Sequence, residues 1–165
     1  MYLLITTPHS GECWDVPVLH FKSSHMLRYI LYSDLGSTLN NAAMLGFRVL
    51  LALELFRVHG MKKFRVENGQ REHVPNPLGL PDKLNGLVAT FADTVVPFLL
   101  MLGVATRLVI LPTIGVTAIG YFVVHRKDSL EVRDVPYVYT LCLLFILLIG
   151  AGRFSIDSLL FLKLQ

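Results

Sequence analysis

Residues 135–152 read VPYVYTLCLLFILLIGAG and contain no charged side chain. A helix needs about 20 mainly apolar residues to cross the hydrocarbon layer of a membrane. Two further stretches meet this requirement, because residues 108–124 carry no charge and residues 84–106 carry only Asp93. The sequence therefore predicts three strong membrane-spanning helices.

The composition of the whole chain agrees with a membrane environment. Hydrophobic residues make up 53% of the 165 positions, and the mean hydropathy of +0.57 is too high for an ordinary soluble protein. The net charge of +3 comes mostly from short basic loops, and Lys62 and Lys63 beside an apolar stretch are typical of a membrane edge. No aromatic-and-basic motif of the RNA-binding kind is present. We expect a lipid bilayer as partner and no nucleic acid.

A fourth span is predicted at residues 39–59, although this stretch contains Arg48, Glu54 and Arg57. The alternative is an amphipathic helix on the membrane surface. We favour a span because charged side chains that face the inside of a bundle and find a partner are tolerated, and they tend to be functional.

The predicted fold is an all-α integral membrane four-helix bundle with up-down-up-down topology. Its spans lie at about residues 39–59, 84–103, 107–125 and 136–152, within a domain of residues 39–165. The short connection at 103–107 makes the second and third spans antiparallel neighbours.

Glycine and proline mark the expected ends of the spans. Gly60 should end the first helix, Pro136 should open the fourth, and residues 75–81 should cover the mouth of the bundle. Pro97 should kink the second span and free the carbonyl of Asp93. Residues 1–38 are expected to form a poorly ordered tail outside the membrane, or to precede a natural start at Met26 or Met44.

The charges of the first two spans are expected to meet. At about 1.5 Å per residue, Arg48 lies about 16 Å deep and Asp93 about 13 Å deep from the shared side of the membrane. We predict a salt bridge between them, since an unpaired charge at this depth is costly. Its role is either to fix the register of the helices or to support function.

Above this pair, a polar funnel is predicted at the mouth of the bundle. Glu54 should pair with Arg57 on the same helix and continue the funnel upward to His59 and His125. Tyr137 and Tyr139 arrive at the same level from the fourth span. Histidines at helix ends and tyrosines at membrane edges are also common without any site, so an interfacial role remains the alternative.

The opposite face of the bundle carries Arg107 and the stretch GAGRFSID at residues 150–157. The glycines can end the fourth span. Asp157 is expected to cap a short segment that begins at Ser158, or to pair with Arg107 or Arg153. A structural latch is the simpler interpretation of these residues.

Nothing in the sequence marks a metal or redox centre. Cys13 lies in the tail and Cys142 in the last span, so an internal disulfide is not expected, and neither a CxxC motif nor a Cys/His cluster with metal-ligand spacing is present. Haem would need histidines that face one another, and His59 and His125 are the candidates, but haem is not expected. No catalytic residue can be assigned from the sequence.

Several of these motifs together resemble the DoxX family. The resemblance rests on residues 102–108 (LGVATRL), His125 at the end of a span, residues 150–157, and an arginine early in the first span followed by residues 59–64 (HGMKKF). It covers about residues 44–160. The family often carries glutamate in the second span where this chain has Asp93.

The resemblance implies a redox-associated subunit of the prokaryotic cytoplasmic membrane. The family name comes from membrane subunits linked to thiosulfate:quinone oxidoreduction, so quinone is the implied ligand, and a partner subunit or homo-oligomer is implied as well. It does not by itself make the chain an enzyme. The alternatives are a proton-coupled carrier that uses Arg48, Glu54 and Asp93, and a non-catalytic scaffold subunit.

Overall fold

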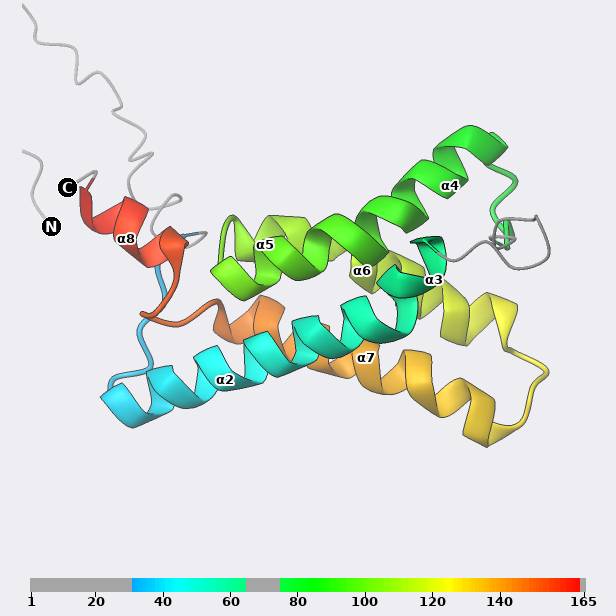
Figure 1. Cartoon of the computed structure of the whole chain (residues 1–165). Helices are drawn as coiled ribbons and strands as arrows, with labels where there is room; N and C mark the ends of the chain where they lie inside the picture. The colour runs from blue at the N-terminus through cyan, green and yellow to red at the C-terminus, as the bar shows by residue number, and fades with distance from the viewer. Residues whose placement is uncertain (1–30, 65–74, 164–165) are drawn as a thin grey trace, which may run out of the picture.

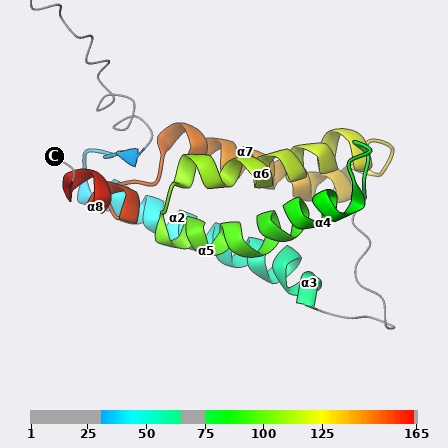
Figure 2. The ribbon, with the colours of Figure 1, turned by 90° about the horizontal axis from the view of Figure 1, so that it is seen from above.

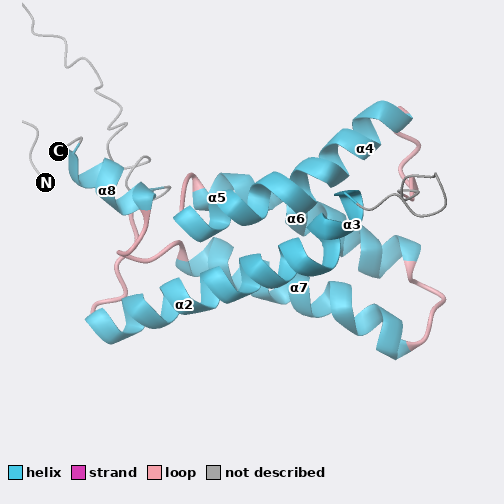
Figure 3. Ribbon diagram, viewed as in Figure 1, coloured by secondary structure: helices cyan, strands magenta, loops and turns pink. Residues whose placement is uncertain are grey.

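A computed structural model of the chain describes residues 31–64 and 75–163. Within these ranges every regular element is a helix (Figure 3). Four of the helical stretches are long and apolar enough to cross a membrane: Thr38–Phe64, Asp82–Leu102, Thr106–Val124 and Leu130–Ile149. The predicted all-α, four-span architecture is therefore confirmed.

The first span is longer than the sequence predicted. Helix α2 (Thr38–Leu55) begins after Ser37, whose side chain accepts a hydrogen bond from the backbone N–H of Asn40. It continues through a π-helical turn, η1 (Phe56–Gly60), into α3 (Met61–Phe64). The prediction that Gly60 ends the helix was wrong. A Cβ atom at Gly60 would lie 2.6 Å from the carbonyl oxygen of Asp93, so glycine is needed here for a close approach to the second span.

The second span contains the predicted irregularity next to Pro97. Helix α4 (Asp82–Thr90) leads into a π-helical turn, η2 (Phe91–Val95), and α5 (Val96–Leu102) follows. Proline has no N–H to donate to the carbonyl four residues earlier, so the α-helical bonding pattern cannot run through this point. The span ends at Gly103, which adopts a left-handed conformation with φ of +70°.

The third and fourth spans form a long helical hairpin. Helix α6 (Thr106–Ile119) ends in a third π-helical turn, η3 (Gly120–Val124), and α7 (Leu130–Ile149) returns. The fourth span begins at Leu130 and not at the predicted Pro136, which lies inside α7. Its first turns carry Glu131, Arg133 and Asp134, so hydropathy alone underestimates the helix there.

The helices form an elongated bundle in which consecutive spans are neighbours (Figures 1 and 2). Helix α2 packs closely on α5, α5 on α6, and α6 on α7. The first and fourth spans meet through aromatic rings. Phe47 contacts Phe145 with ring centroids 5.7 Å apart, and His59 contacts Tyr139 at 5.6 Å.

An apolar core separates the two ends of this bundle. Its members come from all four spans and are at most 1% exposed: Ala52, Leu55, Val96, Leu100, Ile110, Leu143 and Ile146. At one end lie the start of α2, the turn between α5 and α6, and the short C-terminal helix α8 (Ile156–Lys163) (Figure 1). At the other end lie α3, α4 and the loop between α6 and α7.

Part of the predicted tail contacts the domain. The Ser33 hydroxyl accepts a hydrogen bond of 2.7 Å from the backbone N–H of Gly152, and the Asp34 carboxylate accepts one of 2.9 Å from the side-chain amide of Asn41. Residues 1–30, with Cys13, lie outside the described residues, so the expectations about them stay predictions.

Candidate functional site

Arg48 lies buried at the α8 end of the bundle. Its guanidinium donates hydrogen bonds to the backbone carbonyls of Ala151, Phe154 and Met101, the last two at 2.8 and 3.3 Å. The acidic group that interacts with it electrostatically is Asp157. The predicted salt bridge between Arg48 and Asp93 is therefore wrong.

The error came from the vertical register of the first two spans. The contact of Gly60 with the Asp93 backbone places these two residues at one level. Gly60 follows Arg48 by twelve residues, which is about 18 Å along a helix. The depth estimate assumed that both spans start level, whereas α4 extends past the end of the first span (Figure 1).

Asp157 holds the turn between the second and third spans. Its carboxylate accepts hydrogen bonds from the backbone N–H groups of Ala105 at 2.6 Å and Thr106 at 2.9 Å. These are unpaired donors at the N-terminus of α6, where a negative charge is also favoured by the helix dipole. Asp157 thus caps α6, and the predicted partners at Ser158, Arg107 and Arg153 were wrong.

Arg107 has a matching role at the end of the fourth span. Its Nε donates to the carbonyl of Leu147 at 3.0 Å, and one terminal nitrogen reaches the carbonyls of Leu148 and Ile149 at 3.3 Å each. It therefore caps the C-terminus of α7, where a cation is favoured. The side chain of Arg153 is exposed, and its backbone N–H donates to Asn41 at 2.8 Å.

We call this group the Arg48 cluster: Arg48, Gly103, Ala105, Thr106, Arg107, Ala151 and Asp157. Gly103 is required in it, because a Cβ atom there would lie 2.8 Å from a guanidinium nitrogen of Arg48. The predicted latch is present as a set of capping bonds that ties the ends of the spans together. These bonds satisfy helix termini, so the Arg48 cluster is structural.

The opposite end of the bundle contains a cavity of about 600 Å³, which we call the mouth cavity. Residues of all four spans line it, and Pro75, Pro77, Leu78 and Leu80 close part of it. The prediction that residues 75–81 cover the mouth is confirmed. Most of its wall is apolar: Leu55, Val88, Ala89, Pro112, Val116, Ile119, Val124, Val132, Val135 and Pro136.

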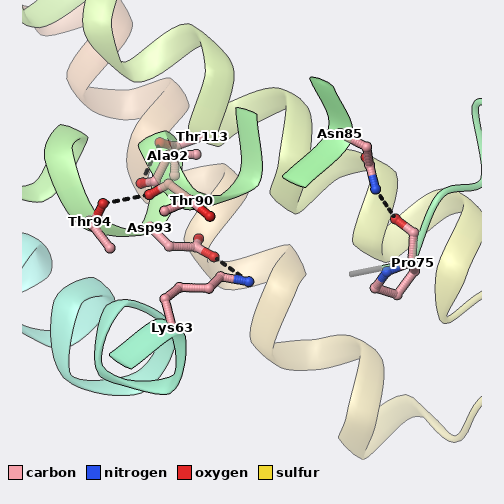
Figure 4. A network of polar contacts seen from close by, with 8 residues as sticks. All are labelled: Lys63, Pro75, Asn85, Thr90, Ala92, Asp93, Thr94 and Thr113. Carbon is pink, nitrogen blue, oxygen red and sulfur yellow. Dashed lines mark hydrogen bonds and ion pairs between the residues drawn. The ribbon is translucent and has the colours of Figure 1, made fainter. Parts of the chain in front are cut away.

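An ion pair lies in the wall of the mouth cavity. Lys63 of α3 places its Nζ 3.4 Å from a carboxylate oxygen of Asp93 in η2 (Figure 4). The two side chains are only 12% and 13% exposed. The sequence identified Asp93 but assigned Lys63 to the membrane edge. The signal that could have found Lys63 is its position one turn after His59 on the same helix.

Polar contacts hold the backbone around this ion pair. Thr113 of α6 donates to the carbonyl of Ala92 at 3.2 Å, and Asn85 donates to the carbonyl of Pro75 at 3.1 Å (Figure 4). The first contact joins η2 to the third span, and the second fastens the loop over the cavity to α4. The surroundings of Asp93 are thus held by bonds from two directions.

The predicted mouth histidines both line the cavity. The ring of His59 contacts that of Tyr139, while Nδ1 of His125 lies 2.7 Å from a carboxylate oxygen of Asp128. Tyr139 lines the cavity, whereas the predicted Tyr137 is exposed and contacts the ring of Tyr121. Three of the four ring side chains predicted at the mouth therefore line the cavity, and Tyr137 does not.

Glu54 does not belong to this site. It forms the predicted local pair with Arg57 at 3.5 Å, but the two side chains are 52% and 73% exposed, respectively. The predicted funnel from the mouth through Glu54 to Arg48 is therefore wrong. Arg48, Glu54 and Asp93 occupy three separate places: the α8 end, the outer surface and the mouth.

Each of the first three spans has its π-helical turn near the mouth cavity. His59 lies in η1, Asp93 in η2, and Gly120 and Val124 in η3, and all four line the cavity. Single π-helical turns inside α-helices occur frequently at functional sites. The mouth cavity is therefore the candidate functional site. Within the described part of the chain, no three His, Cys, Asp or Glu side chains are grouped to hold a metal ion.

Comparison with known proteins agrees with the sequence motifs. The DoxX family profile matches residues 43–126, which include most of the first span and all of the second and third. An uncharacterized protein of Haemophilus influenzae is 30% identical over 129 residues, covering 73% of this chain and 85% of that protein. No solved structure matches the chain. The chain belongs to the DoxX family and is a multi-pass membrane protein in contact with the lipid bilayer.

Proposed function

We propose that this protein is a membrane subunit of a redox complex and that its mouth cavity binds a quinone. The observation that carries the proposal is the Lys63–Asp93 ion pair in a mainly apolar cavity at one end of the bundle. Family membership supports the redox context, because the family name comes from membrane subunits linked to thiosulfate:quinone oxidoreduction.

The size and chemistry of the cavity suit such a ligand. Small-molecule sites commonly have volumes of about 300–1,000 Å³, mostly apolar walls and a few polar groups that fix orientation. A quinone ring is apolar on its faces and carries carbonyl oxygens that need hydrogen-bond donors. The ammonium group of Lys63 is such a donor, and His59 and His125 lie in the same wall.

The ion pair has a distinct role in each state of the ligand. In the empty cavity Asp93 balances the charge of Lys63, which lowers the penalty of keeping either group in an apolar wall. With ligand bound, the lysine can donate to a carbonyl oxygen and the carboxylate can accept from a hydroxyl of the reduced form. The electrons would come from a partner protein of the redox complex.

The carrier alternative has less support. A carrier would need polar groups that continue through mid-membrane. Between the Arg48 cluster and the mouth cavity lies the apolar core, whose members are at most 1% exposed. A scaffold role predicts that changes at the cavity alter assembly with a partner but not ligand binding.

The test is quinone binding by the purified full-length protein in lipid nanodiscs, measured by calorimetry with a short-chain ubiquinone analogue. Lys63→Gln should weaken binding about 10- to 100-fold, since a hydrogen bond to a charged group is worth about 1.5–3 kcal/mol. Asp93→Asn should weaken binding of the reduced analogue more than that of the oxidised one.

The matched control is Lys83→Gln, which removes an exposed lysine of α4 outside the cavity wall. It should leave binding unchanged. The proposal fails if the unmodified protein binds neither form of the analogue and no redox protein co-purifies with it from native membranes.

A further inference from the structure

The outer face of the first span carries an ion pair that the mouth cavity does not use. Glu54 and Arg57 are 52% and 73% exposed and do not belong to the buried face of the helix, which carries Asn41, Met44, Arg48, Ala52 and Leu55; the Glu54 carboxylate is close enough to α7 to act electrostatically on Tyr139. In Figure 1 the first half of α2 forms the lower border of the bundle, and α7 lies below the end of α2. The pair therefore faces whatever surrounds the protein in the membrane.

The level of this pair lies within the apolar layer. The ring contact between His59 and Tyr139 puts these residues at one height, and Glu54 lies farther from the mouth than His59. Above Tyr139 the fourth span continues with exposed Val138 and Val135. Apolar outer surface thus extends about one helical turn beyond Tyr139 toward the mouth, as far as Val135, which follows the exposed Asp134. Charged side chains that face lipid at such a depth are costly and rare.

The same face is shaped for close contact with another helix. Toward the start of α2 it presents two small exposed residues, Ala42 and Gly46, four positions apart. Nothing lies within 4 Å of the place where Gly46 would carry a Cβ atom, and Leu50 beyond it is 69% exposed. Small residues at this spacing let membrane helices approach closely.

We propose that this face, defined by Ala42, Gly46, Leu50, Glu54 and Arg57, binds the same face of a second copy of the chain. The charges favour a second copy as the partner. The face carries one acid, Glu54, and one base, Arg57, so an identical face offers each of them a charge of opposite sign. Two copies in one membrane have the same orientation, and a two-fold axis along the membrane normal brings identical faces together.

In that arrangement Arg57 of each copy pairs with Glu54 of the other. Helical side chains lean toward the N-terminus of their helix, so Arg57 leans toward the level of Glu54. Two symmetric ion pairs would then replace two lipid-exposed ones. The small residues at Ala42 and Gly46 allow the backbones to approach closely at the other end of the face.

Charge reversal tests this pairing directly. Two differently tagged versions of the full chain are expressed together, and one tag is used to recover the other from lipid nanodiscs. Glu54→Arg in both copies, or Arg57→Glu in both copies, places like charges opposite one another. Each should reduce association about tenfold or more, which corresponds to about 1.4 kcal/mol.

Mixing the two variants is the decisive arm. A copy with Glu54→Arg carries two bases and a copy with Arg57→Glu carries two acids, so together they should associate at least as well as the unmodified chains. A pair that acts only within its own helix cannot be restored by mixing. Arg126→Glu, a reversal in the loop after the third span, is the control and should leave association unchanged.

Three results would overturn the proposal. The first is that unmodified copies do not recover one another, and the second is that mixed variants associate no better than each variant alone. The third is that a cross-linkable cysteine at Leu50→Cys, in a chain with Cys13 and Cys142 changed to serine, captures a different protein. The thermal unfolding midpoint of each variant is measured as a control. Midpoints equal to that of the unmodified chain show that a loss of association does not come from a folding defect.

Discussion

The two ends of the bundle use buried charge in opposite ways. In the Arg48 cluster, buried charged groups bond to backbone groups at helix ends. At the mouth, Lys63 and Asp93 bond to each other in the wall of a cavity of about 600 Å³. Burial of a charge alone therefore does not separate the two ends, and the mouth is favoured as the functional end because a cavity lies beside its ion pair.

The largest effect on stability should come from Arg48→Leu. This change leaves several carbonyls without their donor and Asp157 without its cation, at a cost of about 3–5 kcal/mol. Thermal unfolding in detergent should show a much lower midpoint or no folded protein. A midpoint close to that of the unmodified protein would contradict the structural role of the Arg48 cluster.

The second-largest loss of stability should come from Gly103→Ala. Alanine at a φ of +70° is strained, and its Cβ would lie 2.6 Å from that of Ser155 and 2.8 Å from a nitrogen of Arg48. Strain and overpacking together should cost about 2–5 kcal/mol in the free energy of unfolding. Gly115→Ala is the control, because nothing lies within 4 Å of its Cβ position and its φ is not positive.

Changes to the Lys63–Asp93 ion pair at the mouth should reduce stability less. The loss from changing one residue should depend on whether the other is still charged. Lys63→Met or Asp93→Leu alone leaves one poorly solvated charge and should cost about 1–3 kcal/mol. The double change removes both charges and should recover most of that loss. Unfolding midpoints of the four proteins in this cycle measure the coupling, and strictly additive losses would argue against the ion pair.

The smallest effect should come from Arg153→Gln. Although this residue is part of the GAGRFSID stretch, its side chain is exposed and its charge acts on the exposed Asp34, while its backbone N–H donates to Asn41. Unfolding free energy should change by less than about 0.5 kcal/mol. A loss as large as that of Arg48→Leu would mean that the arginine side chain contributes to the Arg48 cluster.

The sequence predicted the bundle well because the bilayer imposes a simple rule on helix length and polarity. The four spans, their order and the cover over the mouth all followed from apolar stretches, prolines and short connections. The predicted ends of the spans were less accurate. Gly60 lies inside a helix that continues, where it allows close contact with the second span. Pro136 lies inside the fourth span, whose first turns are charged. Neither role is visible without the neighbouring helix.

The partners of the buried charges could not be predicted in the same way. Arg48 bonds mainly to carbonyl oxygens, which every residue carries and no sequence pattern marks. Its assigned partner Asp93 was excluded by a register that depends on how far α4 extends past the first span. Lys63 was assigned to the membrane edge for a different reason. A lysine at the end of a membrane helix looks the same in the sequence whether it faces water or a buried carboxylate.

The apolar core has a consequence for sidedness. Apolar residues from all four spans, each at most 1% exposed, fill the middle of the bundle between Asp93 and the Arg48 end, whereas Asp93 itself lines the mouth cavity. Any proton that a ligand takes up or releases at Asp93 must therefore be exchanged with the aqueous phase on the mouth side. The protein would keep the membrane electrically sealed while its chemistry took place at one surface.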